Sequence, residues 1–587
     1  MSPREPAGRL RPSDAGRTVR LEGWVEKRRD LGDLIFLSLR DRSGIAQILF
    51  DRRRCPPEAV EAAATARMED VAAVTGEVAL RAEGQINREI PTGEVEVLAS
   101  RLEFLARAET PPFVVEDRTN ATEELRLQYR YLDLRRPAMQ RHLILRHEMA
   151  FRIRTLLHGR GFVEVETPML TRSTPEGARD FLVPSRLHRG EFYALPQSPQ
   201  LFKQILMVAG LEKYFQIARC FRDEDLRADR QFEFTQIDLE MSFVTEEDVY
   251  EVVEDLLIEA FAAAGITAPR PFPRLTYREA LDRYGTDRPD LRYGLELTDL
   301  TAAAQGSGFT PFEKTLAEAG TVRGLRVPEG AALTRKSLDE LAELARKHGA
   351  AGLLWVKKAG GEISSPAKKG IASTVMDAVL QSAGVGEGDL LLLVADRPRA
   401  ALAALAAVRA AVARSLGLVD ETRHAFCWIT EFPLLERDEA TGAWNPVNHP
   451  FTAPRPEDIE RLESDPENVR ARAYDVVLDG WELGSGSIRI HRADVQERVF
   501  RRLGISEEEG RERFGFLLEA LRYGAPPHGG VALGLDRICA IAAGVASIRD
   551  VIAFPKTTSG LDLMTRSPSA VPAGPLRELG IALAAEE

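Results

Sequence analysis

The chain has 587 residues, 44% of them hydrophobic and 29% charged, and its formal net charge at pH 7 is −12. A chain of this length exceeds what one hydrophobic core usually supports, so we expect several domains. The acidic balance argues against nonspecific coating of nucleic acid, although it leaves room for a local basic surface.

The cysteines and the apolar stretches indicate the cellular compartment. Cys55, Cys220, Cys427 and Cys539 are far apart and form no CxxC pair, so we expect neither a disulfide framework nor a zinc site. The N-terminal stretch MSPREPAGRLRPSDAG contains no apolar export segment. The most apolar stretch, AALAALAAVRAAVARSLG, contains two arginines and is predicted to be a water-exposed helix of a globular domain. We therefore expect a cytoplasmic protein with no membrane segment.

Residues 1–105 are predicted to form a compact β domain. In DLIFLSLRD, Ile35, Leu37 and Leu39 share one face, which is typical of a strand with one buried side. SGIAQILFD and TGEVEVLASRLEFL supply further strands after glycine-containing turns, and PPEAVEAAATARM is predicted to be helical. Several short strands with one intervening helix favour an OB-fold β-barrel.

Phe36 is out of phase with the predicted core of this domain. It lies on the opposite face of its strand beside Arg40, near the basic run Lys27–Arg29. An aromatic ring on a basic strand face stacks on single-stranded bases, which contributes about 1–3 kcal/mol per base. The spacing alone also allows a structural role, in which Phe36 belongs to a second small core that packs against the helix.

The amino-acid composition of the rest of the chain changes at several points, which indicates domain boundaries. We predict a Pro-rich and charged linker or hinge at 106–140, the first part of a second domain at 141–287, an Ala/Gly-rich α/β insertion at 288–420, the second part of that domain at 421–560 and a C-terminal extension at 561–587. The part at 141–287 begins with a helix, and FVEVETPML then alternates as a strand that Pro168 ends. In CFRDEDLRADRQFEFTQIDLEMSF, both charges are packed densely before an alternating strand, a pattern unlike the spaced i, i+4 pairs of a solvated helix.

Seven stretches, taken in chain order, resemble a known enzyme family. FVEVETPML, FRDEDLRADRQFEFTQ and GGVALGLDRI resemble motifs 1, 2 and 3 of class II aminoacyl-tRNA synthetases. STPEGARDF, ALPQSPQLFKQ, NHPFT and GWELGSGSIRIH are similar to sequences of the bacterial-type aspartyl-tRNA synthetases. The resemblance implies an α+β multidomain protein with an antiparallel catalytic sheet. It also implies a homodimer, because motif 1 lies at the dimer interface in this class.

The implied reaction joins an amino-acid carboxylate to the α-phosphate of ATP. The carboxylate is already ionised near pH 7, so positioning and charge stabilisation are needed rather than a general base. The resemblance assigns catalysis to Arg222, Arg537 and Glu482. ATP-binding positions are Arg222, Asp223, Glu224, Gln231, Phe234, Glu482, Gly534, Leu535, Asp536 and Arg537. Phe234 stacks on adenine in this scheme, and the acids Asp475 and Glu482 hold Mg²⁺, a hard cation that prefers oxygen ligands.

Recognition of aspartate is implied by a second set of residues. The aspartate-binding positions are Glu176, Gln200, Lys203, Arg222, Asp238, His449 and Arg489. In this scheme Arg489 and Lys203 bind the side-chain carboxylate. Asparagine would leave these buried cations unpaired, and such losses can reach a discrimination of about 10⁴–10⁵-fold between the two amino acids. A lone histidine such as His449 is more often structural, and the resemblance supplies its role.

The resemblance also makes tRNA(Asp) the partner of the barrel. Anticodon-binding positions are Arg29, Phe36, Gln47 and Glu94, with Phe36 stacked on the central base. Two positions influence whether tRNA(Asn) is also charged: Leu31 is typical of strict enzymes and Gly84 of relaxed ones. We predict a strict enzyme, and a non-discriminating enzyme is the alternative. Phe232 stands where the family usually has proline.

Other classes share parts of this pattern. Asparaginyl and lysyl synthetases have the same two-domain plan, but Arg489 with GARDF and QSPQLFK favours aspartate. A paralogue that makes asparagine usually lacks the barrel. A non-catalytic tRNA-binding protein is expected to lose Arg222, Glu482 or Arg537, and all three are present.

Overall fold

The structure is a computed structural model that describes residues 3–174, 178–438 and 440–584. Two compact units divide the chain. The first contains residues 1–144, 553–557 and 561–568, and the second contains residues 145–552, 558–560 and 569–587. Among the described residues, no helix combines the length and the hydrophobicity that crossing a bilayer requires.

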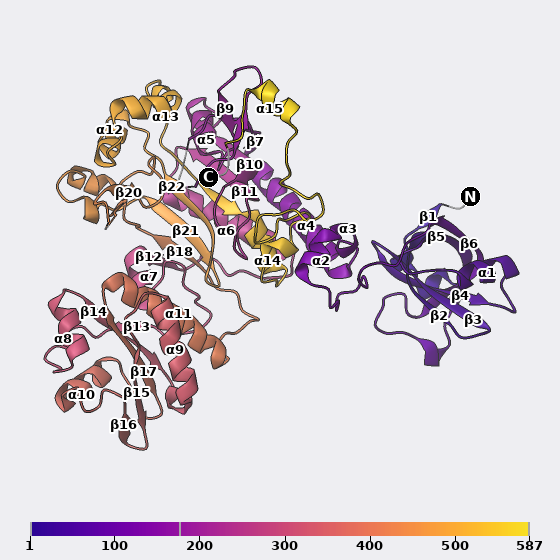
Figure 1. The fold of residues 1–587 in the computed structure, drawn as a ribbon, viewed down its shortest axis with the longest axis horizontal. Coiled ribbons are helices and arrows are strands. Elements are labelled where there is room, and N and C mark those ends of the chain that lie inside the picture. The colour runs from indigo at the N-terminus through magenta and orange to yellow at the C-terminus, as the bar shows by residue number, and fades with distance from the viewer. Residues whose placement is uncertain (1–2, 175–177, 439, 585–587) are drawn as a thin grey trace. The chain divides into compact units, whose positions relative to one another are not determined.

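The first unit contains a closed barrel (Figure 1). Its elements are β1 (Arg4–Glu5), β2 (Thr18–Asp30), β3 (Leu34–Asp41), β4 (Gly44–Asp51), α1 (Pro57–Ala64), β5 (Val71–Leu80) and β6 (Val95–Ala106). The strand order is β1-β2-β3-β4-β6-β5, and an additional pairing of β2 with β5 closes the sheet. Ile35, Leu37 and Leu39 are fully buried inside it, so the predicted OB-fold barrel and its core face are confirmed.

Short helices follow the barrel in the same unit. They are α2 (Glu123–Gln128) and α3 (Arg130–Asp133), and α4 (Pro137–Gly159) runs from this unit into the second. The carboxylate of Asp133 is fully buried and accepts hydrogen bonds from Arg130 at 2.5 Å and Arg136 at 2.7 Å. A buried carboxylate needs such partners, so this pair of arginines stabilises the segment between barrel and catalytic sheet.

An eight-stranded sheet forms the centre of the second unit (Figure 1). Its strands are β7 (Val163–Glu164), β10 (Lys213–Phe221), β11 (Glu233–Ser242), β12 (Arg274–Thr276), β18 (Phe426–Thr430), β21 (Ala473–Leu478), β22 (Trp481–Ile488) and β23 (His528–Gly534). The order is β12-β18-β21-β22-β23-β11-β10-β7, and only the outermost pairs, β12–β18 and β10–β7, are parallel. The predicted antiparallel catalytic sheet is thus confirmed.

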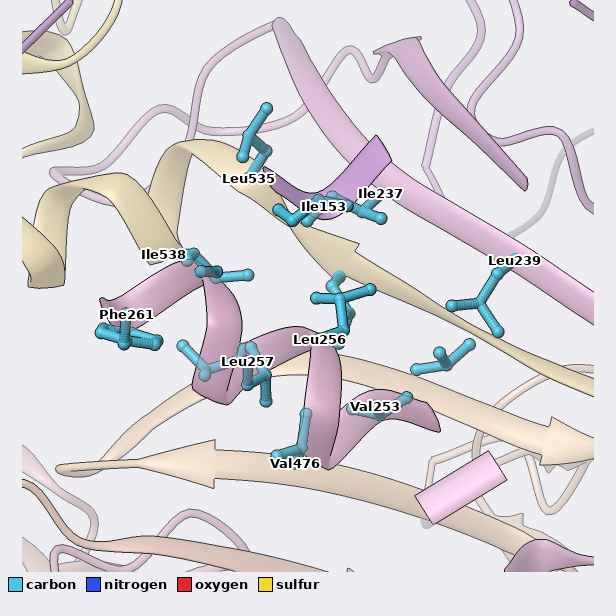
Figure 2. Close-up of a cluster of buried hydrophobic side chains, with 14 of the residues drawn as sticks. Ile153, Ile237, Leu239, Val253, Leu256, Leu257, Phe261, Val476, Leu535 and Ile538 are labelled. Carbon is cyan, nitrogen blue, oxygen red and sulfur yellow. The ribbon is translucent and has the colours of Figure 1, made fainter. Parts of the chain in front are cut away.

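Three helices cover one face of this sheet, and polar side chains of β11 lie on the other face. Helices α4, α6 (Glu246–Ala262) and α14 (Leu535–Ala542) pack on it, and Figure 2 shows Leu256, Phe261 and Ile538 in their shared core. Successive side chains of a strand point to opposite faces. Because Ile237 and Leu239 of β11 belong to this core, the residues between and beside them face the other way. That alternation positions the site described below.

Further elements surround the sheet. They are β8 (Leu182–Pro184), β9 (Phe192–Ala194), α5 (Gln200–Val208), α7 (Tyr277–Tyr284), β19 (Leu435–Arg437), β20 (Trp444–Pro446), α12 (Ala493–Arg502), α13 (Glu507–Leu521) and α15 (Ala573–Leu579). Cys427, Ile429 and Val477, which alternate with members of the first core, belong to a second core on the other side of β18 and β21. The sheet is therefore buried on both sides at this edge.

The insertion is a separate α/β layer structure within the second unit. Its strands are β13 (Leu297–Asp299), β14 (Thr321–Val327), β15 (Leu354–Ala359), β16 (Glu362–Ser364) and β17 (Leu390–Asp396), in the order β13-β14-β17-β15-β16. Its helices are α8 (Thr310–Ala317), α9 (Arg335–Lys347), α10 (Ser373–Ser382) and α11 (Pro398–Ser415). Leu390 and Leu392 of β17 enter the core under α9 and α11, whereas Leu391 and Leu393 enter the core under α8 and α10. A strand buried on both faces explains the run LLLLV.

Candidate active site

A cavity of about 340 Å³ lies on the polar face of the catalytic sheet. Its walls come from β11, β22 and β23, from α5 and from the segment after β20. Eight predicted site residues line it: Gln200, Lys203, Arg222, Glu224, Asp238, His449, Glu482 and Arg489. Residues from segments far apart in the sequence thus meet in one hollow.

Two cations and two carboxylates form a buried network at the floor of the cavity. Lys203 Nζ lies 2.8 Å from Asp238 Oδ2 and 3.3 Å from Glu240 Oε2. Arg489 donates to both oxygens of Glu240 at 2.9 and 3.1 Å. All four side chains are almost fully buried, where an unpaired charge is strongly destabilising. The network is balanced in charge only while both acids are ionised.

The two acids of this network have different environments. Burial raises the pKa of Asp238 to about 6, even though Lys203 lies beside it. Burial also acts to raise the pKa of Glu240, but Arg489 and Lys203 outweigh it, and the pKa ends below its usual value. Glu240 is therefore fully paired with its two cations, whereas Asp238 can accept an interaction with a further positive group.

Several buried polar atoms face this cavity without a hydrogen-bond partner in the described part of the chain. They are Nε2 of Gln200, Oδ1 of Asp238 and Oδ1 of Asn448. A buried polar atom without a partner costs about 1–3 kcal/mol, so such atoms are expected where a ligand binds. One donor and two acceptors suit a zwitterionic ligand with a carboxylate and an ammonium group.

The β10–β11 hairpin supplies the cationic side of the cavity. The guanidinium of Arg222 lies 5.0 Å from the ring centroid of Phe234, and the Arg222 amide donates to the carbonyl of Phe232 at 2.9 Å. Glu224 pairs with Arg230 at 3.0 Å. Asp223 lies 3.6 Å from Arg179, outside hydrogen-bond range. Gln231 of the same hairpin is almost fully buried, at 2% exposure.

The segment after β23 holds this hairpin in place. Arg537 donates to the backbone carbonyl of Glu482, and its Nη2 lies 3.2 Å from Asp229 Oδ2. Asp536 is buried and accepts from the Thr235 amide at 2.8 Å and from Arg146 at 2.5 Å.

The other predicted ATP positions of this segment have little free side-chain surface. Leu535 belongs to the hydrophobic core, and Gly534 pairs with Gln236 in the sheet. The side chains of Leu535 and Asp536 are therefore occupied by the fold itself, and Arg537 is linked to the cavity through the backbone of Glu482, which lines it.

Asp475 and Glu482 lie on adjacent strands, β21 and β22. Asp475 is buried, its Oδ1 has no partner in the described chain, and burial together with the Glu482 carboxylate raises its pKa well above the usual value. Two carboxylates that repel one another in this way suit a bound divalent cation. Among the described residues, no group of three or more His, Cys, Asp or Glu side chains is arranged to hold a metal ion.

In the barrel, the predicted anticodon positions lie on β2, β3, β4 and the end of the β5–β6 connection. Arg29 pairs with Phe36 in the β2–β3 register, and Phe36 is outside the buried cluster of the barrel. Gln47 donates to Glu96 at 2.7 Å, and the Glu94 side chain is exposed. An aromatic ring and an arginine therefore share a surface, as the sequence predicts.

The two discrimination positions are at loops of the same unit. Leu31 is 70% exposed at the β2–β3 turn. Gly84 is exposed, and a Cβ added to it meets no atom within 4 Å. Both positions can therefore contact a partner, and neither is required by the barrel core.

Comparison with known proteins decides the family. Residues 122–558 match the family described as tRNA synthetases class II (D, K and N), and residues 19–105 match the OB-fold nucleic acid binding domain. The aspartate–tRNA ligase of Geobacillus kaustophilus is 52% identical over 583 residues, which cover 99% of this chain and 98% of that protein. The chain belongs to the class II aspartate–tRNA ligases.

Other relatives of the ligase extend the comparison. The aspartate–tRNA(Asp/Asn) ligase of Caldanaerobacter subterraneus is 51% identical over 98% of this chain and 97% of that protein. Asparaginyl-tRNA synthetase from Pyrococcus horikoshii, complexed with asparaginyl-adenylate, has the same fold, with a TM-score of 0.60 at 20% identity over 95% of this chain and 99% of that chain. The predicted family, fold and enzyme class are thus confirmed.

Two sequence features of the ligase site, Glu176 and Phe232, remain to be placed. Glu176 lies outside the described residues. Phe232, in place of the family's proline, packs edge-on against Phe181 at 5.5 Å between ring centroids. A Cβ added to Gly560 would lie 2.6 Å from the Phe232 ring, so glycine is required there.

Sequence reasoning missed three residues of the site. Glu240 binds both cations, Ser487 accepts from Arg489 at 2.7 Å, and Asn448 turns an unpartnered oxygen to the cavity. Strand alternation could have predicted Glu240, because it is two positions from Asp238 on the same strand and so lies on the same face.

Proposed function

We propose that this ligase activates L-aspartate with ATP in the cavity and transfers the aspartyl group to tRNA(Asp). A carboxylate oxygen of aspartate attacks the α-phosphorus, a new P–O bond forms, and the bond to pyrophosphate breaks. The 3′-terminal ribose hydroxyl of the tRNA then attacks the aspartyl carbonyl and AMP leaves. No step needs a protein nucleophile, because the reaction depends on positioning and on stabilising the charge of the phosphoryl group.

The observation that carries this proposal is the joint placement of Arg222 and the buried network in one cavity. Arg222 is free to bridge two anions, because a guanidinium fork binds a carboxylate and a phosphate oxygen at once. Lys203 and Arg489 form the cationic end for the side-chain carboxylate, and Asp238 Oδ1 is placed for the ammonium group. Phe234 offers its ring to adenine.

Magnesium fits Asp475 and Glu482. When bound there, the ion neutralises charge on the phosphate oxygens. Asp475 presents a buried oxygen without a partner in the described chain, and Arg537 holds the backbone of Glu482. The chain's own contribution is to keep the two carboxylates close despite their repulsion.

The proposal is tested by ATP–pyrophosphate exchange with aspartate and with asparagine. We expect exchange with aspartate alone, and Arg222→Ala is expected to lower it by about 10³-fold or more, because a donor aimed at developing charge is lost. Arg278→Ala, which removes a guanidinium that is 92% exposed on α7, is the matched control. Near-normal exchange by Arg222→Ala would contradict the role given to Arg222.

The tRNA scope separates two candidate functions. Leu31 favours a strict enzyme, whereas the Caldanaerobacter relative is named as a ligase for both tRNA(Asp) and tRNA(Asn). Aspartylation of two transcripts that differ only in the anticodon, GUC against GUU, distinguishes them. Strictness predicts a large preference for GUC, and equal efficiency would favour the non-discriminating function.

The motif 1 segment supports a homodimer. Val163 and Leu170 of this segment, and Phe151 on the preceding helix α4, are large apolar residues that are 46–59% exposed. Exposed apolar residues of this size are typical of a surface that a second copy covers. Sedimentation equilibrium should give twice the chain mass, and Phe151→Glu should weaken association while Leu418→Glu, on an exposed leucine of the insertion, should not. A monomeric wild type would refute the dimer.

A further inference from the structure

The turn between β21 and β22 sets the position of the two acids proposed to hold the cation. Asp479 and Gly480 form this turn, with φ values of +53° and +85°. Asp475 precedes the turn on β21, and Glu482 follows it on β22. Positive φ is unfavourable for aspartate, so the surrounding contacts must stabilise it. The turn is therefore the direct connection between the two strands that carry the carboxylates.

The Asp479 carboxylate is held from both sides of the insertion. Oδ1 accepts from the Ala425 amide at 2.9 Å, and His424 Nδ1 lies 2.7 Å from Oδ2. Arg292 Nε lies 3.4 Å from Oδ1. Arg292 precedes β13, the first strand of the insertion, whereas His424 and Ala425 follow α11, its last helix. The segments that enter and leave the insertion therefore converge on one carboxylate, whose residue is 9% exposed.

A helix of the insertion orders the entering segment. Arg409 of α11 is 2% exposed, and it donates to the carbonyls of Asp290 at 2.9 Å and Leu295 at 2.8 Å. Its guanidinium lies 4.2 Å from the ring centroid of Tyr293. An arginine with this many backbone acceptors leaves the segment little freedom to move.

The same segment touches the turn directly. The Asp290 carboxylate pairs with Arg292 at 2.7 Å, which orients the guanidinium toward Asp479. A Cβ added to Gly480 would lie 3.4 Å from the Asp290 Cβ, so the turn packs closely against the segment. The contacts run without a gap from α11 through the entering segment to the turn.

We propose that Asp479 is a positioning residue through which the insertion fixes the Asp475–Glu482 pair for its cation. The role rests on the proposed function, since it concerns the same cation site. Asp475 and Glu482 repel one another, and a loosened turn lets them separate. Side chains that orient metal ligands from outside the coordination shell typically contribute 10–100-fold to metal affinity. A residue that only stabilised the fold would leave cation affinity unchanged in the folded protein.

The test measures cation binding in the full-length enzyme. Mn²⁺ affinity is measured by electron paramagnetic resonance with a non-hydrolysable ATP analogue, for wild type, Asp479→Asn and Asp479→Ala. We expect Mn²⁺ affinity to fall about 10-fold in both variants, while the KM for aspartate stays within about twofold. Arg292→Gln keeps Asp479 and removes only its ion pair with the segment that enters the insertion. We expect this variant to lower Mn²⁺ affinity by about threefold.

A matched control separates this role from loss of an ion pair in general. Asp339→Asn breaks the exposed pair with Arg335 on α9, 3.0 Å in length, and should leave Mn²⁺ affinity unchanged. Unchanged affinity in folded Asp479→Asn and Arg292→Gln would overturn the proposal, even if Asp479→Ala fails to fold. If wild type shows no aspartate-dependent exchange, the proposed function fails instead, so the two failures are distinguishable.

Discussion

The cavity on the catalytic sheet and the proposed anticodon face of the barrel use charge in opposite ways. Lys203 and Arg489 are buried and already paired with Asp238 and Glu240, so each cation is fixed before substrate arrives. Arg29 on the barrel is exposed beside Phe36. A buried network provides selectivity, because an unsuitable ligand leaves charges unpaired, whereas an exposed face provides stacking and steering that tolerate change.

The largest effect on the buried network is expected from the substitution Glu240→Gln. The substitution leaves Arg489 and Lys203 with one negative partner, and removing one member of a buried ion pair costs about 3–5 kcal/mol. We expect kcat/KM for aspartate to fall by about 10³-fold and the melting temperature to drop. Glu233→Gln, on the same strand but paired with the half-exposed Arg219, is the control and should cost at most about 1 kcal/mol. Equal effects of the two would contradict the importance of burial.

A pH titration tests the second acid of the network. The pKa of Asp238 is raised to about 6, so its ionised fraction falls as pH drops through that value. Asp238 is proposed to attract the ammonium of aspartate only when ionised. The KM for aspartate should therefore rise as pH is lowered from 8 to 5, and Asp238→Asn should have a high KM that does not change over this range. A pH-dependent KM in Asp238→Asn would assign the titration to another group.

On the barrel, Phe36→Ala should weaken tRNA binding by roughly 10-fold, in keeping with about 1–3 kcal/mol for one stacked base. ATP–pyrophosphate exchange should not change, because Phe36 is outside the unit that contains the cavity. Phe36→Tyr keeps the aromatic face and should restore affinity. A tRNA affinity unaffected by Phe36→Ala would favour a purely structural ring.

The smallest effect is expected at Phe232. Its ring contacts Phe181 and the site of Gly560 without reaching the buried network. Phe232→Ala should lower the free energy of unfolding by about 1–2 kcal/mol and raise the KM for ATP no more than about threefold, measured by denaturant titration and exchange kinetics. A large loss of kcat would show that this chain's departure from proline belongs to the chemistry.

The contrast also shows where pattern arguments succeed. Alternation assigns Ile35, Leu37 and Leu39 to the barrel core and leaves Phe36 outside it, because a strand has a side-chain period of two. The same rule places Asp238 on the polar face of β11. For Asp536 the motif alone indicates ATP binding, and the structure adds that its carboxylate accepts hydrogen bonds from Thr235 and Arg146 of other elements. A linear pattern gives the face of a residue but not its partner.

The sequence by itself determined the barrel core through strand alternation and the family through its motifs, because both are local properties of the chain. The antiparallel sheet and eight residues that line the cavity followed from the resemblance. The tertiary structure alone decided which charges pair: Glu240 with Arg489 and Lys203, and Asp479 with both ends of the insertion. Electrostatic energy depends on distance and burial, and both are fixed only when segments hundreds of positions apart pack together.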